Sequence, residues 1–164
     1  MLKANSKRQR QLPRGHIAIV AACYNRKYVD GMLKAALKEL EAAKVGQIET
    51  YRVPGSFEIP VVVSRLLHRE QNRPEAIICL GLIIQGETAH ADHIGTAITN
   101  ALMDLQVWAG TPVVHEVLQV RDEKQATARC LDPERNRGAE AAQTAIEMAR
   151  LLRGKPFGDP VGPG

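Results

Sequence analysis

The sequence predicts an α/β protein, a three-layer α/β/α sandwich built on a four-stranded parallel sheet. Four short segments rich in apolar and β-branched residues alternate with segments whose apolar residues recur at helical spacing. The third apolar segment, AIICLGLII (76–84), has no polar alternation, so both of its faces should be covered, as in a parallel sheet. A chain of 164 residues suits one domain with a single core.

In the first half of the chain, strands and helices are expected to alternate over residues 16–24, 27–46, 47–55 and 56–70. The first helix repeats its apolar residues every three or four positions and should end at Gly46. The second strand closes with Pro54-Gly55, a turn signal. Ser56 could cap the second helix, and Pro60 is tolerable only in its first turn.

In the second half, the order strand, helix, strand, helix, helix is expected over residues 76–84, 90–109, 111–120, 123–131 and 138–154. A single domain of residues 15–154 follows from this alternation. It is flanked by a flexible, disordered basic tail at residues 1–14 and by a Pro/Gly tail at residues 155–164.

Composition indicates a soluble globular protein, with 45% apolar and 24% charged residues. No apolar segment approaches the roughly 20 residues that span a bilayer, so no membrane partner is expected. The three cysteines have unrelated spacings and form no zinc pattern. Cys23 and Cys79 lie in strand-like runs, which indicates reduced, buried thiols and a cytoplasmic location.

The formal net charge of +4 is concentrated in residues 1–14, which hold five basic residues and no acid. Such a tail can attract nucleic acid, but a solvated, disordered tail is the favoured interpretation. The rest of the chain is nearly neutral and lacks a basic face with interspersed aromatic residues. Nucleic acid is therefore not expected as a partner.

Ligands of parallel α/β sheets bind beyond the carboxyl ends of the strands. Four segments are therefore candidates for a site: Tyr24-Asn25, Gly55 to Glu58, Gln85 to His90, and the region from Gln119 onward. In the first, a tyrosine ring and an amide could contact a ligand, or the pair could be only a turn.

Other candidate residues also have two interpretations. Phe57-Glu58 could contact a ligand, or could be a core aromatic followed by a charge that favours a helix start. Arg129 and Arg137 could bind phosphate or hydroxyl groups, although single arginines near helix ends are more often surface charges.

The polar stretch GETAHADHIG (86–95) follows the third strand directly. A strand-to-helix turn at Gly86 to Thr88 favours an anion. Glu87, His90 and His93 could share a helix face and bind a metal, but no further ligand is evident, so no metal is expected. A single histidine in acid–base chemistry is favoured, and an ordinary polar helix start is the remaining alternative.

Together these segments resemble the lumazine synthase family of riboflavin biosynthesis, whose fold is flavodoxin-like. The matching stretches are CYN (23–25), VPGSFEIP (53–60), GLIIQGETAHADHI (81–94) and RNRGAEAAQTAIEMARLL (135–152). They occur in the family's order and spacing, and similarity runs from about residue 16 to residue 153.

The resemblance implies condensation of 5-amino-6-(D-ribitylamino)uracil with 3,4-dihydroxy-2-butanone 4-phosphate. The products are 6,7-dimethyl-8-ribityllumazine, phosphate and water, and no metal or organic cofactor is implied. The family assembles as pentamers, pairs of pentamers or icosahedral shells, with active sites between adjacent subunits. A homo-oligomer acting on two small-molecule substrates is therefore expected.

The resemblance also implies roles for individual residues. His90 matches the proposed proton-transfer histidine, with Asp92 as its local partner, and His93 is left without a catalytic role. Glu87 and Thr88 match the phosphate-binding turn. Eight residues match contacts to the pyrimidine or the ribityl chain, or lie next to such a residue. They are Tyr24, Asn25, Ser56, Phe57, Glu58, Ile83, Ile84 and Arg137.

Arg129 matches the arginine that completes the phosphate site from a neighbouring subunit. Four residues depart from the family pattern. Gln85 stands where many members have Arg or Lys, and Glu116 replaces a typical Gly. His115 replaces a Phe that lies against a neighbour's pyrimidine pocket, and it is expected to line that pocket, although it could instead be a half-buried strand histidine. Arg137 stands for a Lys. These changes leave open a low-activity paralogue that binds lumazine or flavin, or a structural shell protein.

Overall fold

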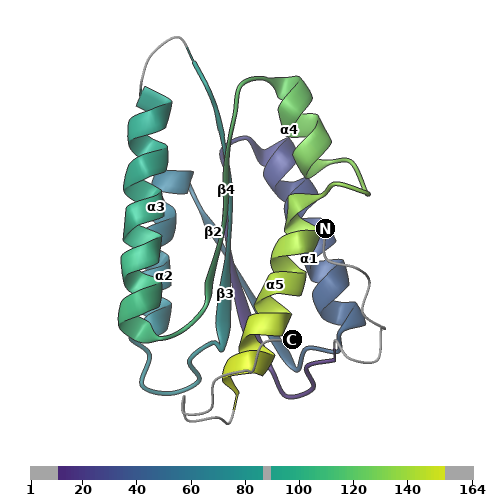
Figure 1. Cartoon of the computed structure of the whole chain (residues 1–164), viewed down its shortest axis with the longest axis vertical. Coiled ribbons are helices and arrows are strands. Elements are labelled where there is room, and N and C mark those ends of the chain that lie inside the picture. The colour runs from purple at the N-terminus through teal and green to yellow at the C-terminus, as the bar shows by residue number, and fades with distance from the viewer. Residues whose placement is uncertain (1–10, 87–89, 154–164) are drawn as a thin grey trace, which may run out of the picture.

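The computed structural model describes residues 11–86 and 90–153 and confirms the three-layer α/β/α sandwich (Figure 1). All four strands are parallel and lie in the order β2-β1-β3-β4. Their bounds are His16–Ala22 for β1, Gln47–Val53 for β2, Ala76–Ile84 for β3 and Val113–Val120 for β4. The chain turns to one side of β1 for β2 and to the other for β3, which creates a topological switch point between β1 and β3, as in flavodoxin-like folds.

Helices cover both faces of the sheet (Figure 1). One face carries α1 (Arg26–Ala42), α4 (Glu123–Cys130) and α5 (Arg137–Leu152). The other face carries α2 (Ile59–Leu67) and α3 (His90–Ala109). Each helical layer therefore shields one side of the strands from water.

Alternate residues of the strands enter two separate cores. In β1, Ile17 and Ile19 belong to the core under α1 and α5, whereas Ala18 and Val20 belong to the core under α2 and α3. In β3, all residues over 76–82 are buried, which confirms that both faces of this strand are covered. Burial of one aliphatic side chain contributes about 1.5 to 3 kcal/mol, so the aliphatic side chains of this strand contribute strongly to the stability of the fold.

The first helix ends earlier than predicted, at Ala42 rather than Gly46. Lys44 adopts a left-handed backbone conformation with φ of 54°, and the Val45 amide donates to the carbonyl oxygen of Leu40. This hydrogen-bond pattern terminates a helix. Gly46 has a different role, because a Cβ there would overlap the backbone of the segment that precedes β1.

The prediction that Ser56 caps the second helix is wrong. Ser56 opens a 3-10 turn, η2 (Ser56–Glu58), that precedes α2. The Glu58 carboxylate accepts the Gly55 backbone N–H at 2.8 Å and closes this turn. Pro60 lies in the first turn of α2, as expected. Backbone N–H groups in this turn have no partner within the helix, so the missing N–H of proline costs no hydrogen bond.

Cys23 is exposed, contrary to the prediction that it is buried. The reason is that β1 ends at Ala22, so Cys23 begins the turn beyond the strand. Cys79, in β3, is buried as predicted. Burial raises the pKa of the Cys79 thiol, which keeps it protonated.

Leu12 lies in the segment that was expected to be a flexible tail, but its side chain is buried in the core. Its amide donates to the carbonyl oxygen of Ala43 at 2.9 Å, so ordered structure begins before residue 14. The rest of the predicted basic tail, residues 1–10, and the predicted Pro/Gly tail lie outside the described residues.

Candidate active site

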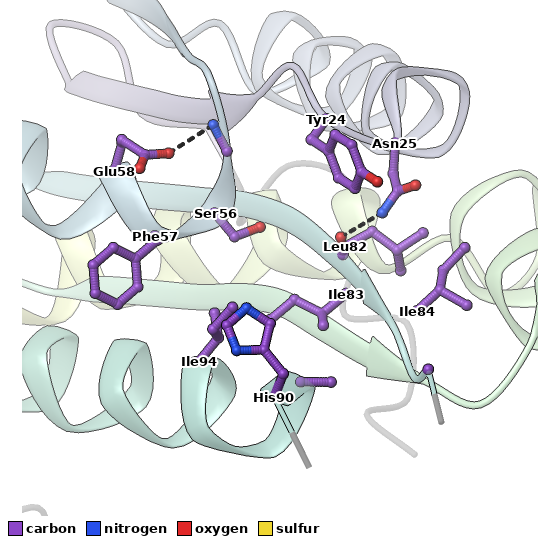
Figure 2. Close-up of a pocket in the computed structure, with 13 residues that line it drawn as sticks. Tyr24, Asn25, Ser56, Phe57, Glu58, Leu82, Ile83, Ile84, His90 and Ile94 are labelled. Atoms are coloured by element: carbon purple, nitrogen blue, oxygen red, sulfur yellow. Dashed lines mark hydrogen bonds between the residues drawn. The ribbon is translucent and has the colours of Figure 1, made fainter. Parts of the chain in front are cut away.

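A hollow of about 580 Å³ lies beyond the carboxyl ends of β1, β2 and β3, at the switch point of the sheet (Figure 2). We call it the switch-point hollow. It brings together eight of the site residues predicted from the sequence: Tyr24, Asn25, Ser56, Phe57, Glu58, Ile83, Ile84 and His90. This is the place where the rule for parallel sheets expects a ligand.

The turn after β1 forms one wall of the switch-point hollow. Asn25 has a left-handed backbone (φ 55°, ψ 40°), and its Nδ2 donates to the carbonyl oxygen of Leu82 at 2.8 Å. The amide of Tyr24 donates to the carbonyl oxygen of Pro54 at 3.0 Å. The turn is thus tied to both neighbouring strand ends, while the Tyr24 side chain is 74% exposed and free to stack on a ligand.

The turn after β2 forms the second wall. Ser56 packs against Gly81 of β3 so closely that a Cβ at position 81 would overlap the Ser56 hydroxyl oxygen. Phe57 is 62% exposed although it is one of only two phenylalanines in the chain. A large apolar ring that is exposed to solvent beside a hollow is typical of a binding surface rather than of a core.

His90 is the first residue of α3, and its ring projects into the switch-point hollow between Phe57 and Ile83 (Figure 2). Its side chain is exposed and so accessible to a substrate. Ile83 and Ile84, at the end of β3, are half-buried and form the floor beside it.

Asp92 and His93 follow on the exposed side of α3. Asp92 accepts a hydrogen bond from the Gln119 side chain on β4. The partnership predicted between Asp92 and His90 thus has no support in the hydrogen bonds of the described residues. His93 does not line the switch-point hollow.

A second hollow of about 780 Å³ lies at the carboxyl end of β4, beside α4 and α5. Four arginines line it, and we call it the arginine hollow: Arg121, Arg129, Arg135 and Arg137. It contains three predicted site residues, Gln85, Arg129 and Arg137, which therefore do not join the other eight within one chain.

Arg137 is bound by two carboxylates. Its Nε and Nη2 donate to the two oxygens of Glu116 at 3.1 and 2.8 Å, and its Nη1 donates to Glu140 at 2.6 Å. Glu116 is only 6% exposed. Burial raises the pKa of Glu116, and the hydrogen bonds from Arg137 act in the opposite direction.

His115 lies in neither hollow. It points from β4 toward α3, where its Nε2 lies 2.8 Å from the Thr99 hydroxyl oxygen, and its Nδ1 accepts the Val117 amide at 3.1 Å. These contacts place the ring proton on Nε2. Burial lowers the pKa of His115, which favours the neutral ring. Its expected role in a neighbour's pocket stays a prediction.

Glu87 and Thr88 lie outside the described residues, so the proposed phosphate turn and the Glu87-His90-His93 metal hypothesis remain predictions. Across residues 11–86 and 90–153, no group of three or more His, Cys, Asp or Glu residues is placed to hold a metal ion. No helix in this part of the chain is long and apolar enough to cross a membrane.

Sequence reasoning missed Leu82, Ala91 and Ile94, which also line the switch-point hollow. Ile94 lies four residues after His90, so helical spacing could have placed it on the same face. Leu82 contributes a backbone carbonyl, for which the side-chain sequence carries no signal. Arg121 lies in the candidate region from Gln119 onward, although it was not named there. Arg135, between α4 and α5, was missed, because its place beside Arg129 depends on tertiary packing.

Comparison with known proteins gives a consistent result. The family model described as 6,7-dimethyl-8-ribityllumazine synthase matches residues 14–153. A protein of that name from Kineococcus radiotolerans is 37% identical over 140 residues, which cover 84% of this chain and 85% of the relative. Proteins of the same name from Pyrococcus furiosus and Thermococcus onnurineus are 36% and 34% identical, over 84% of this chain and 85% and 88% of their own lengths.

Proposed function

Because this chain belongs to the 6,7-dimethyl-8-ribityllumazine synthase family, we propose that the switch-point hollow is its active site. The chain is a transferase of riboflavin biosynthesis. It condenses 5-amino-6-(D-ribitylamino)uracil with 3,4-dihydroxy-2-butanone 4-phosphate to give 6,7-dimethyl-8-ribityllumazine, phosphate and water. The observation that supports the proposed site most strongly is the convergence of eight expected residues from three strand ends on one hollow.

The pyrimidine ring and ribityl chain are proposed to bind between the turns after β1 and β2. The exposed ring of Tyr24 offers a flat apolar face, on which the pyrimidine can stack. Phe57 contributes apolar surface at the mouth, and Ser56 and Glu58 offer hydrogen-bonding groups to the polyol. Ile83 and Ile84 contribute backbone groups beside the ring.

His90 is proposed to move protons during the reaction. Imine formation, phosphate elimination and ring closure each transfer a proton, and an exposed histidine near neutral pH can donate or accept it. The larger part of the rate enhancement is assigned to alignment of the two bound substrates.

Phosphate is proposed to bind at the turn containing Glu87 and Thr88, with its charge neutralised by Arg129 of an adjacent subunit. The location of Arg129 in the arginine hollow supports a site shared between two subunits, since that hollow is separate from the switch-point hollow of the same chain. A functional site then requires two subunits.

The chain is accordingly proposed to form a pentamer or a multiple of pentamers. Exposed large apolar side chains on α2 and α3 support assembly, because such surfaces are typical of protein interfaces. These side chains are Val61, Met103, Val107 and Trp108. We propose a cytoplasmic location, which the free thiols of the three cysteines support.

An assay with both substrates tests the proposed activity. We expect the fluorescence of the lumazine product to rise well above the uncatalysed rate, and a rate equal to that background would overturn the assignment. Tyr24→Ala should raise the KM for the ribitylaminouracil roughly tenfold, which corresponds to about 1.4 kcal/mol of lost stacking. The exposed Lys38 on α1 gives a control, because Lys38→Ala should leave both KM values unchanged. Light scattering of the purified protein tests the assembly.

A further inference from the structure

Two residues that depart from the pattern of the lumazine synthase family, Glu116 and Arg137, contact each other. We propose that Glu116 is a positioning residue, which orients Arg137 to donate to the ribityl chain of a substrate bound in the switch-point hollow of an adjacent subunit, the same site that Arg129 completes. This inference rests on the proposed function and on the family pattern, in which Arg137 stands for a lysine near that chain. It adds a residue to the site whose side chain does not itself touch substrate.

The contact between the two side chains has the geometry of a two-point clamp. Glu116 projects from β4 under α5, and both of its oxygens accept from the guanidinium of Arg137, at 3.1 and 2.8 Å. The Glu116 side chain is 7% exposed and that of Arg137 is 32% exposed. A carboxylate buried to this degree needs a charged partner, and the planar fork of an arginine meets both of its oxygens in one fixed orientation. A lysine is a single point charge and would not fix this orientation.

The backbone under Arg137 is fixed as well. Asn136 caps α5: its Oδ1 accepts the Gly138 amide at 2.9 Å, and its Nδ2 donates to the carbonyl oxygen of Cys130 at 2.6 Å. Gly138 packs directly on α1, where a Cβ would overlap the carbonyl oxygen of Met32. Because backbone and guanidinium are both held, Arg137 keeps one position at the edge of the arginine hollow.

This arrangement determines what Arg137 can still bind. A guanidinium has five N–H donors, and Glu116 and Glu140 take three of them. The remaining donors belong to a cation whose charge is largely compensated by two carboxylates. Such a group suits the neutral hydroxyls of a polyol better than a phosphate. Arg129 lines the same hollow and forms no ion pair with a carboxylate of the described residues, so it remains available for the phosphate.

Glu116 and Arg137 should therefore behave as one unit, in place of the Gly and Lys that the family pattern has at these two positions. Arg137→Lys alone leaves a buried carboxylate without its two-point partner. Glu116→Gly alone leaves the guanidinium without its clamp. The double variant removes both defects together, so the effects of the two substitutions should not add.

The test compares kcat and both KM values for wild type, Glu116→Gly, Arg137→Lys and the double variant. Each single substitution should raise the KM for the ribitylaminouracil about tenfold, with the KM for the butanone phosphate changed less than about twofold. The double variant should recover to within about threefold of wild type. Glu147→Gln, at an exposed position of α5, is the matched control and should change neither KM.

Three outcomes would overturn the proposed pair: single variants that match wild type, equal changes in both KM values, or a double variant as poor as the sum of the singles. Thermal melting and light scattering of every variant show whether it folds and assembles. If Glu116→Gly fails to fold, Glu116→Gln retains the side-chain volume and should show the same selective rise in KM.

A binding measurement separates this inference from the proposed function. Titration with 6,7-dimethyl-8-ribityllumazine, followed by fluorescence, needs no turnover. If wild type forms no lumazine, the proposed activity fails, and the titration still tests the pair. Equal affinity of wild type and Glu116→Gly for the lumazine would then overturn the role of Glu116, whereas a roughly tenfold weaker affinity of the variant would support it.

Discussion

The side-chain amide of Asn25 donates a 2.8 Å hydrogen bond to the backbone carbonyl oxygen of Leu82. The bond joins the turn after β1 to β3 across the switch point of the sheet (Figure 2). It therefore fixes the separation between the wall that carries Tyr24 and the floor formed by Ile83. Asn25 can make it because its left-handed backbone, with φ of 55°, is one that asparagine tolerates well.

Asn25→Gly should lower the free energy of unfolding by about 1 kcal/mol, because it keeps the backbone conformation but loses the side-chain hydrogen bond. Asn25→Ala should cost roughly 1 kcal/mol more, since alanine is strained in the left-handed region. Urea denaturation at one protein concentration measures both. Equal stability of the alanine and glycine variants would show that the turn relaxes and that backbone strain plays no part.

His90→Ala should lower kcat roughly 10-fold to 100-fold, the lower part of the usual acid–base contribution. His93→Ala is the matched control, because His93 lies on the same helix but outside the switch-point hollow. Steady-state rates between pH 6 and 8 measure the effect. Full activity of His90→Ala over that range, or an equal loss in both variants, would contradict the assignment of proton transfer to His90.

Arg129→Ala should raise the KM for the butanone phosphate about tenfold or more, because a charge-assisted contact to phosphate is lost. If sites form between subunits, refolding a mixture of Arg129→Ala and His90→Ala chains should restore activity. In random oligomers about a quarter of the sites would receive both intact residues. A mixture no more active than its two components would argue against shared sites.

The stability contributed by Glu49 should depend on pH. Burial alone would raise the pKa of Glu49, but hydrogen bonds from Tyr51 and Arg69, the latter at 2.9 Å, bring its pKa below the ordinary value. A carboxyl with a depressed folded-state pKa stabilises the protein above its unfolded pKa, and this stabilisation is lost as the pH falls through the folded pKa.

Glu49→Gln should therefore lower the free energy of unfolding by about 1 to 2 kcal/mol at pH 7. The difference from wild type should shrink as the pH falls below about 4. Chemical denaturation across this range measures the change, with Glu41→Gln at an exposed position of α1 as the control. A difference that stayed constant with pH would mean that the ion pair contributes nothing to folding.

His115→Phe should make the protein less sensitive to acid. Partial burial holds the pKa of His115 below its ordinary value, so the wild type loses stability as the pH falls below about 6.5 and the half-buried ring must take up a proton. The variant loses the contact with Thr99 and should be less stable by about 1 kcal/mol at pH 7.5.

The melting temperature of His115→Phe relative to wild type should thus rise as the pH is lowered from 7.5 to 5. Melting curves at one protein concentration provide the comparison, because assembly also contributes to stability. A constant offset between the two proteins over this range would show that the folded protein does not favour the neutral ring of His115.

The fold could be predicted because its signals are local. The apolar run over 76–84 predicts β3, and the helical spacing of apolar residues predicts α1. Neither prediction needs information from distant residues. Errors occurred where a tertiary contact determines the outcome. Ser56 has the chemistry of a cap, but it packs against Gly81, and Glu58 closes the turn instead.

The candidate site was predictable in part for the same reason. Residues that follow the ends of β1, β2 and β3 meet at one edge, so their convergence follows from the order of strands. The pairing of Glu116 with Arg137 joins positions 21 residues apart and depends on how α5 lies over β4. Both residues drew attention as departures from a family pattern, but their contact could not be inferred from either one alone.

The three consecutive residues Asn136, Arg137 and Gly138 have different roles: the first and third hold helices in place, and the second is available for binding. Asn136 closes the start of α5 and Gly138 seats that helix on α1, while Arg137 alone faces the arginine hollow. An arginine transplanted to the start of another helix would lack this seat and would not reproduce the placement. The transferable unit is therefore the junction of three helices together with Glu116 on β4, and an engineer who wishes to move this binding group must move α1, the end of α4 and that strand with it.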